Sequence, residues 1–436
     1  MTAIEANADG LIGPTHNYAG LAFGNLASER NFGSVSNPRA AALEGLAKMR
    51  RVAGLGLPQF VLPPHERPDV AFLERLGWPP TQPYAGEAHV AAAWSASAMW
   101  AANAATVTPS PDSGDGRVHL TPANLLTQLH RSLESGQTRR ALQALLPDPV
   151  RFAVGEPLPA HPAFADEGAA NHVRLCAEGG GPGVEIFVWG RTAGDWDGRF
   201  PARQTLEAST ALARRHGSRR PVFARQARRA IEAGAFHNDV VCVGTGPCLL
   251  HHEAAFEDTA AVHDAIRRAA DGLFDPVFLV VPESELSLAD AVASYLFNSQ
   301  LLQPPDEDRL VLLCPAEVAE TPASHAVAEA LAAGNGPIGR VEFVDVRQSM
   351  RNGGGPACLR LRLALTPDEL AATNPAQRLT PELDRALTAW VEARYRDRLS
   401  PADLGDPALI EEGRAALDAL TRLLGLGGDF YPFQRT

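Results

Sequence analysis

The sequence predicts an α/β fold in which helices and strands alternate along the chain. Helical patterns with one apolar face recur between short runs rich in β-branched and aromatic residues, and the two kinds are interleaved rather than segregated. The composition is that of a globular protein, because 45% of the 436 residues are hydrophobic and 21% are charged. A chain of this length corresponds to about three ordinary domains, although a large α/β fold can also absorb it in one unit.

The first helical pattern follows Asn37 and Pro38, an N-cap residue and a proline suited to the first helical position. Leu43, Leu46 and Met49 then recur on one face of this helix. Further helices are expected over about 204–216, 259–270, 288–302, 381–398 and 407–424.

The expected strands are short apolar runs that lie between and after these helices. They are Val184–Val188, Val240–Val243, Val277–Val281, Leu310–Leu313, Val341–Val344 and Leu359–Leu363. The last run alternates Leu with Arg, which is typical of a strand with one buried face. No internal repeat and no low-complexity linker is visible.

Charge and cysteine content argue against several classes of protein. The formal net charge of −12 disfavours a nucleic-acid partner held by bulk charge. Five cysteines without a CxxC pair disfavour a disulfide framework or a zinc ribbon. The first residues lack the features of a secretory signal, and polar residues interrupt the most apolar window, 91–107. We therefore expect a cytoplasmic protein with reduced thiols and no membrane partner.

The most distinctive local feature is the loop Asn352–Cys358, which leads directly into the alternating strand. Its three consecutive glycines permit unusual backbone angles and close approach of a ligand. A thiol at the mouth of such a loop can be presented to a pocket. The alternative is an ordinary glycine-rich turn followed by a small buried cysteine.

His237 and Asp239 enter the apolar run that follows them, two residues apart. In an extended chain both side chains would point to the same face, an arrangement suited to acid–base work on a charged substrate. The alternative is a capping or salt-bridged pair at the start of a strand.

Asp166 and Glu167 are flanked by small residues, so a ligand can approach them closely. The alternative is a solvated acidic turn. Together Cys358, His237 and Glu167 supply a nucleophile, a base and an orienting acid, the general logic of a catalytic triad.

Several familiar catalytic and binding motifs are absent. No phosphate-binding GxxxxGK[ST], no GxGxxG after a strand, no GxSxG and no HExxH occurs. The adjacent His251 and His252 do not suit one metal ion in a regular strand or helix, and we expect them in an exposed polar turn.

Longer motifs follow one another along the whole chain. They are Asp9–Leu21, Ser36–Arg39, Pro63–Pro68, Trp100–Thr106, Leu129–Glu134, Asp166–His172, Tyr295–Leu302, Asn352–Cys358 and Tyr431–Gln434. In this set the chain resembles the N-succinylarginine dihydrolase family of the guanidine-modifying, or pentein, superfamily.

The resemblance implies an α/β pentein propeller of five ββαβ units about a pseudo-fivefold axis. Residues 1–436 would form a single catalytic domain with the active site in the central channel. Cys358 is implied as the nucleophile, with His237 and Glu167 as the other catalytic residues. Substrate binding is implied for Ala19, Gly20, Leu21, Ala22, Phe23, Gly24, Asn25, Leu26, Ala27, Ser28, Asn103, His130, Arg131, Arg203, Asp239 and Asn352.

The reaction implied by the resemblance converts N2-succinyl-L-arginine to N2-succinyl-L-ornithine, two ammonia and one carbon dioxide. No cofactor or metal is implied, and a homodimer is expected. We expect Cys358 as a thiolate beside a protonated His237, and Asp239 against the guanidinium group. Arg131 and Arg203 are candidates for the substrate carboxylates, their alternative being surface ion pairs.

Two other functions share parts of this pattern. A deiminase or an amidinotransferase on the same scaffold would use the same cysteine, histidine and acid. A non-catalytic binding pentein would not need Cys358, His237 and Glu167 together.

Overall fold

The computed structural model describes residues 3–79, 86–177, 180–194 and 198–435. In this part of the chain the strands form five three-stranded sheets of identical plan. In each sheet the first strand pairs antiparallel with the second, and the second pairs parallel with the third. A helix makes the crossover between the two parallel strands, as parallel pairing requires.

The five units follow the chain in order. Unit one contains β15 (Arg360–Leu365), β1 (Ile4–Gly10), α2 (Pro38–Gly54) and β2 (Gln59–Leu62). Unit two contains β3 (Ala105–Thr108), β4 (Val118–Pro122), α6 (Ser135–Leu145) and β5 (Phe152–Val154). Unit three contains β6 (His172–Cys176), β7 (Gly183–Trp189), α7 (Leu206–His216) and β8 (Pro221–Arg225). Unit four contains β9 (Cys242–Thr245), β10 (Cys248–His252), α9 (Thr259–Ala270) and β11 (Val277–Val281). Unit five contains β12 (Gln300–Leu302), β13 (Leu310–Pro315), α12 (Pro322–Ala333) and β14 (Ile338–Val344).

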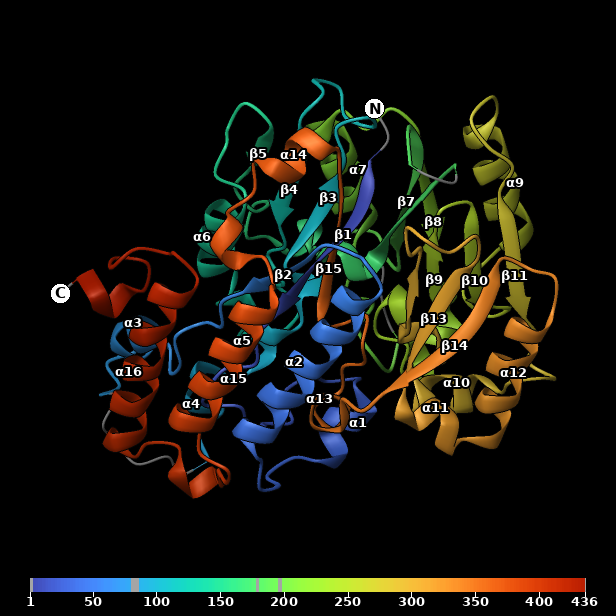
Figure 1. Cartoon of the computed structure of the whole chain (residues 1–436). Coiled ribbons are helices and arrows are strands. Elements are labelled where there is room, and N and C mark those ends of the chain that lie inside the picture. Colours follow the sequence, from blue (N-terminus) through green and yellow to red (C-terminus); the bar gives the residue numbers. More distant parts are fainter. Residues whose placement is uncertain (1–2, 80–85, 178–179, 195–197, 436) are drawn as a thin grey trace.

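The first unit is assembled from segments near both ends of the chain. β15 pairs antiparallel with β1, from Ile4 opposite Leu365 to Asp9 opposite Arg360. Figure 1 shows this pairing near the centre, with dark-blue β1 beside orange β15 and the crossover helices farther out. The plan confirms the expected α/β propeller of five ββαβ units.

Shorter helices and two long C-terminal ones surround these units. They are α1 (Leu26–Arg30), α3 (Val70–Arg75), α4 (Ala88–Ala93), α5 (Leu129–Ser132), α8 (Arg228–Glu232), α10 (Leu288–Ser294), α11 (Ala316–Glu320), α13 (Arg347–Asn352), α14 (Pro367–Ala371), α15 (Pro381–Arg394) and α16 (Pro407–Leu423). The 3-10 turns are η1 (Ser97–Met99), η2 (Ala101–Asn103), η3 (Pro162–Phe164), η4 (Gly168–Asn171), η5 (Asn238–Val240), η6 (Leu296–Asn298), η7 (Pro375–Gln377), η8 (Pro401–Asp403) and η9 (Pro432–Arg435).

Most of the expected helices and strands are present, and their ends follow from local chemistry. Asn37 caps α2 by accepting a hydrogen bond from the Ala40 N–H at 2.9 Å. Gly217 ends α7 in the left-handed conformation, with φ of 63°. Leu46 and Met49 are fully buried on α2, against which α15 and α13 pack.

The expected helix over 288–302 is wrong in its second half. Helix α10 ends at Ser294, and Tyr295 adopts the left-handed conformation with φ of 57°. A 3-10 turn follows, and Gln300–Leu302 form strand β12. Apolar residues recur on both sides of the buried polar residues Asn298–Gln300, so periodicity alone cannot separate a buried helix from a buried strand here.

Packing is distributed among the units. One apolar cluster fills the space between the sheets of units three and four and helix α9. Another lies between the sheets of units one and two and α6, and a third lies between units four and five. Of the helices in the described residues, none is long and apolar enough to span a bilayer.

Candidate active site

Four of the expected site residues lie in turns that immediately precede the first strand of a unit, and Asn298 at the end of η6 holds the same place before β12 in the fifth unit. Asn103 ends η2 before β3, and Glu167 comes directly before η4 and β6. His237 caps η5 before β9, and Cys358 comes just before β15. The pseudo-fivefold plan therefore gathers residues scattered between positions 103 and 358 around one axis.

Hydrogen bonds join these five turns into a closed ring, which we call the waist. Each bond links one unit to the next around the axis. The bonds are Ala102 N to Cys358 O (3.0 Å), Asn103 Nδ2 to Glu167 O (2.7 Å), Asn238 N to Asn171 Oδ1 (2.8 Å), Asn298 Nδ2 to Asp239 O (3.3 Å) and Cys358 N to Asn298 Oδ1 (3.2 Å). Because the bonds run through the site residues themselves, the fold and the site geometry depend on one another.

Glu167 and His237 form a buried pair between units three and four. His237 Nε2 lies 2.7 Å from Glu167 Oε2, and each residue is 1% exposed. Burial lowers the pKa of His237 to about 4, although Glu167 acts in the opposite direction. Burial alone would raise the pKa of Glu167, but the hydrogen bond from His237, together with the charges of Arg203 and Arg131, holds that pKa below its ordinary value. The Nδ1 atom of His237 has no hydrogen-bond partner among the described residues.

Cys358 contacts Asp239 rather than His237. Its Sγ–H donates to Asp239 Oδ2 at 3.7 Å, and the residue is 3% exposed. Burial, and next the negative charge of Asp239, raise the pKa of the Cys358 thiol well above its ordinary value. The pKa of Asp239 is itself raised to about 7 by burial.

These pKa shifts bear on the expected thiolate at Cys358 beside a protonated His237. Burial disfavours the charged form of both groups, so the ligand-free geometry favours a thiol and a neutral imidazole. A positive charge that enters the site would favour the thiolate.

The expected common face of His237 and Asp239 is also wrong. The two residues belong to a 3-10 turn, with His237 at its N-cap, and not to an extended strand. The turn gives them different partners, Glu167 for His237 and Cys358 for Asp239.

The three glycines before Cys358 are required by close neighbours. A side chain at Gly353, which has φ of 96°, would overlap Asn25, and one at Gly354 would overlap Trp100. A side chain at Gly355 would press on Asn298 Oδ1, the atom that accepts the Cys358 N–H. The loop therefore serves close packing around the cysteine.

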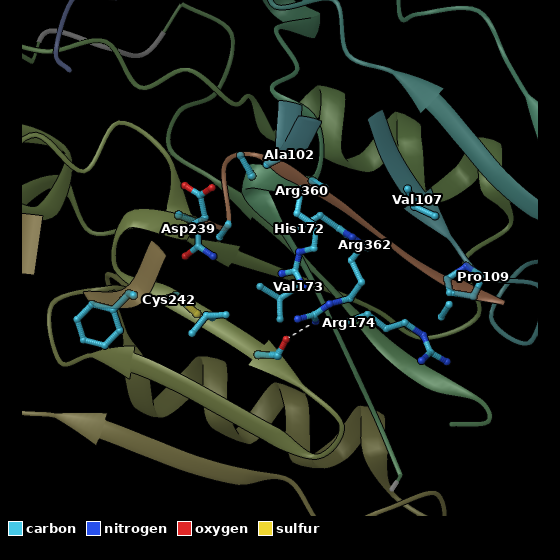
Figure 2. Close-up of a pocket in the computed structure, with 18 residues that line it drawn as sticks. Ala102, Val107, Pro109, His172, Val173, Arg174, Asp239, Cys242, Arg360 and Arg362 are labelled. Atoms are coloured by element: carbon cyan, nitrogen blue, oxygen red, sulfur yellow. Dashed lines mark hydrogen bonds between the residues drawn. The ribbon is translucent and has the colours of Figure 1, made fainter. Parts of the chain in front are cut away.

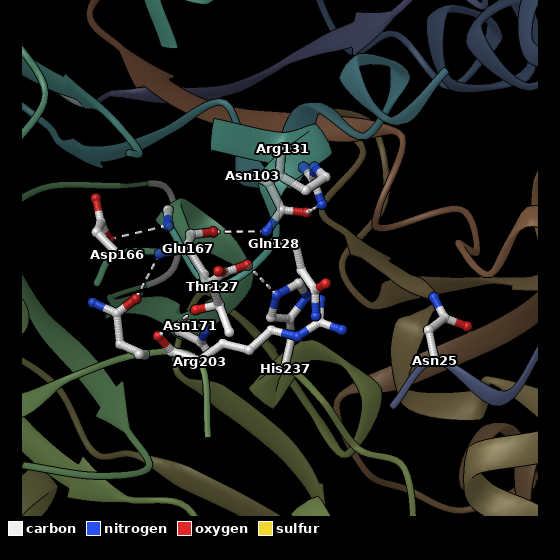
Figure 3. Close-up of polar contacts among 12 residues, drawn as sticks. Asn25, Asn103, Thr127, Gln128, Arg131, Asp166, Glu167, Asn171, Arg203 and His237 are labelled. Carbon is white, nitrogen blue, oxygen red and sulfur yellow. Dashed lines mark hydrogen bonds and ion pairs between the residues drawn. The ribbon is translucent and has the colours of Figure 1, made fainter. Parts of the chain in front are cut away.

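Arg131 and Arg203 are buried, so the interpretation of either as a surface ion pair is wrong. Each is 2% exposed. Arg203 donates from Nη2 to the Phe23 carbonyl at 2.8 Å, and Arg131 pairs through Nε with Glu134 at 3.1 Å. Within the described residues, Arg203 Nε and Arg131 Nη2 have no hydrogen-bond partner. Figure 3 shows both guanidinium groups near Asn103, Glu167 and His237.

The segment 19–28 lies over the site and ends in helix α1. Gly20 and Gly24 have φ of 61° and 88°, which glycine adopts without strain. Asn25 donates from Nδ2 to the Gly353 carbonyl at 2.8 Å, and the Phe23 carbonyl accepts from Arg203. Loop 19–28 is thus held by hydrogen bonds at two points, one of them within the Cys358 loop.

A pocket lies beneath this loop. It is lined by Ala19, Gly20, Leu21, Ala22 and Ser28 from the loop and by Trp100, His130 and Asn352 below it. Asn352 donates to the Asn17 carbonyl at 3.2 Å, and burial lowers the pKa of His130 well below its ordinary value. The structure thus brings His130, Asn352 and the loop together on one side of the waist.

Two other sequence interpretations are corrected by burial. Asp166 and Glu167 are 0% and 1% exposed, which excludes a solvated acidic turn. His251 and His252 lie on strand β10 and are fully buried, with His252 Nε2 donating to the Leu286 carbonyl at 2.9 Å. In the described residues, no three His, Cys, Asp or Glu side chains gather as a metal site.

Comparisons with known proteins agree along the full length. A model of the succinylarginine dihydrolase family matches residues 2–434. An N-succinylarginine dihydrolase 2 of Caulobacter vibrioides is 67% identical over the whole of both chains, and an N-succinylarginine dihydrolase of Burkholderia thailandensis is 54% identical over the same extent. The chain belongs to the succinylarginine dihydrolase family. It is an enzyme of this hydrolytic type.

Solved structures agree with the fold of this family member. The N-terminal domain of ArgZ, covalently bonded to a reaction intermediate, has a TM-score of 0.52 and 16% identity, covering 82% of this chain and 97% of its own. ArgZ is an arginine dihydrolase from cyanobacteria, and a substrate-bound structure of the same domain has a TM-score of 0.50 and 15% identity over the same extents. At this level of identity the likeness shows the fold alone, the five-unit pentein propeller.

The sequence analysis did not identify two residues that lie beside the cysteine. Asn298 bridges Cys358 and Asp239, and the Tyr295 hydroxyl donates to the Gly353 carbonyl at 3.1 Å. Both fall in the motif Tyr295–Leu302, which helical periodicity assigned to a helix.

Proposed function

We propose that the chain hydrolyses N2-succinyl-L-arginine to N2-succinyl-L-ornithine, two ammonia and carbon dioxide, with residues 1–436 acting as one catalytic domain. The observation that carries this proposal is the waist, where the pair Glu167–His237 and the pair Cys358–Asp239 lie within one hydrogen-bonded ring. Full-length relatives named for this reaction support it.

The guanidinium group of the substrate would itself activate Cys358. Asp239 Oδ1 has no partner in the described part of the chain, so this carboxylate can bind the entering cation. A cation beside Asp239 favours its ionised form and lowers the pKa of the neighbouring thiol. The thiol would therefore ionise only when substrate is bound, which protects it in the empty enzyme.

Neutral His237 is suited to receive the thiol proton. Its Nε2 is bonded to Glu167, which leaves the Nδ1 lone pair free to accept a proton. Glu167 would then stabilise the resulting imidazolium, which returns the proton to the departing amine. The C–S bond forms, the C–N bond breaks, and one ammonia leaves a covalent amidino-thioether on Cys358.

Water would then complete the first round and repeat the chemistry. His237 accepts a proton from water, the C–S bond breaks, and a ureido intermediate results. A second attack by Cys358 on this uncharged carbon releases the second ammonia, and hydrolysis gives a carbamate that loses carbon dioxide. Asn103 carries no charge, so its amide can hydrogen-bond both the guanidinium and the ureido group.

Arg131 and Arg203 would bind the two carboxylates of the substrate, which are the succinyl carboxylate and the α-carboxylate of the arginine. Each is a buried guanidinium with an N–H group that meets no partner among the described residues. Burial lowers the pKa of Arg203 to about 10, which is still high enough for a cation at neutral pH. A buried cation with an unpaired N–H group destabilises the protein, and a carboxylate of the ligand would remove this cost by accepting the hydrogen bond.

Product analysis tests the proposal. Purified enzyme should convert N2-succinylarginine to succinylornithine with two ammonia per substrate, and should hardly use free arginine. One ammonia with N2-succinylcitrulline as the end product would instead identify a deiminase, and amidine transfer to an added amine would identify an amidinotransferase. We further propose a cytoplasmic homodimer, which sedimentation analysis and cell fractionation would test.

A further inference from the structure

A second cavity occupies the axis on the side of the waist opposite loop 19–28. All five units contribute to its wall. At the waist each unit supplies at least one residue, and the lining there includes Ala357, Ala102, Ala170, Asn238, Asp239 and Phe297. The wall continues along the strands that lead away from the waist, past Arg174 and Gly244 to Ala364. We call this cavity the axial pore.

Asp239 belongs both to the reaction site and to the axial pore. Its Oδ2 atom accepts the Cys358 thiol, and its side chain lines the pore beside Ala102. Figure 2 shows Asp239 and Ala102 at one side of the lining and Pro109 at the other. The pore therefore begins where the guanidinium nitrogens would lie.

The lining is polar enough to hold water at the waist. Asn238 is 1% exposed, and neither atom of its amide has a nitrogen or oxygen partner in the residues described. Three of the other waist residues are alanines, which leave room for molecules as small as water.

Positive charge is in excess farther along the pore. Arg360 Nη1 lies 3.1 Å from Glu5 Oε1, and Arg362 Nε lies 3.5 Å from the same oxygen. Two guanidinium groups therefore share one carboxylate. Arg174 is paired with Asp112. A positive wall of this kind repels ammonium but not neutral ammonia.

The proposed reaction creates a transport problem that the pore can solve. Each substrate needs two water molecules and releases two ammonia molecules, while the covalent intermediate fills the pocket under loop 19–28. That loop is fastened at Asn25 and at Phe23, on the side where the substrate enters. The small reactants and products therefore need a second path.

We infer that the axial pore is the passage by which water enters and ammonia leaves during turnover. This inference rests on the proposed function. Ammonia departs from the guanidinium carbon at Asp239, passes the small side chains of the waist and leaves beyond Ala364. Outside it becomes ammonium, and the arginines oppose its return.

Substitutions at Ala364 test the passage without touching the reaction site. Ala364 lies six positions beyond Cys358 on β15, and its side chain lines the pore. We expect Ala364→Trp to lower kcat about tenfold with an unchanged KM, because release of products becomes rate-limiting. Ala364→Leu should lower kcat less, and Ala364→Ser, the matched control, should retain wild-type kcat.

The outcomes separate this inference from the proposed function. A wild-type kcat in folded Ala364→Trp, or an equal loss in Ala364→Ser, would overturn the passage while succinylornithine production stands. If the wild type forms no succinylornithine, the proposed function fails and the passage with it. If Ala364→Trp does not fold, the comparison of Ala364→Leu with Ala364→Ser decides by the same criterion.

Discussion

The buried carboxylate of Asp239 should destabilise the ligand-free protein at neutral pH, and the same negative charge should favour binding of the substrate cation. Burial raises the pKa of its carboxyl from 3.8 to about 7. A pKa raised in the folded state contributes stability that is complete below about pH 4 and is lost as the pH rises to about 7. At about 1.4 kcal/mol per pH unit over about three units, the free energy of unfolding falls by up to about 4 kcal/mol.

Asp239→Asn removes this charge and keeps the size of the side chain. The free energy of unfolding of the variant, minus that of the wild type, should therefore grow by up to about 4 kcal/mol between pH 4 and pH 8. Urea denaturation across this range measures it. Asp306→Asn, at an exposed position, controls for the loss of one negative charge from the chain.

Binding should show the opposite preference. The wild-type KM should rise as the pH falls below about 7, because a protonated Asp239 no longer attracts the guanidinium. A stability difference that does not change with pH, together with an unchanged KM, would refute the role of Asp239 argued here.

Three further substitutions test the surroundings of the cysteine. Asn298→Ala should shift the pH dependence of Cys358 alkylation by iodoacetamide upward, because the hydrogen bond from Asn298 lowers the pKa of this thiol; an unshifted profile would count against a positioning role. Arg203→Ala should raise KM by about 30-fold or more, since loss of one partner of a desolvated charge pair costs about 2–5 kcal/mol, and Arg203→Lys should restore it only in part. An unchanged KM in both variants would remove Arg203 from succinyl recognition. Asn103→Asp should stop after one round and accumulate N2-succinylcitrulline, which mass spectrometry would detect. Full conversion to succinylornithine would contradict the argument that a neutral amide is required at this position.

The alternation of helices and strands could be predicted because caps and periodicity are local properties. The five-unit plan was reached through resemblance and not through a visible repeat. The structure explains why: the turns that occupy equivalent places carry different residues, such as Asn103, Glu167 and Cys358. The pairing of β1 with β15 joins segments about 350 positions apart, which no local pattern reveals.

The residue types of the site could be predicted from the sequence, but their protonation states could not. Cys358, His237 and Glu167 were chosen for their functional groups, and the Glu167–His237 contact is present. The protonation states could not be predicted, because they depend on burial, which tertiary packing determines. For the same reason Arg203 could not be distinguished in the sequence from a surface arginine.

Trapping the covalent intermediate tests the central claim most directly. Enzyme mixed with N2-succinylarginine and quenched in acid during turnover should gain the mass of substrate less one ammonia, and peptide mapping should place the adduct on Cys358. Cys358→Ala should bind substrate, form no adduct and release no ammonia, whereas Cys176→Ala, with a buried thiol outside the waist, should behave as wild type. Turnover near the wild-type rate in Cys358→Ala, or an adduct on another residue, would contradict catalysis by this thiol.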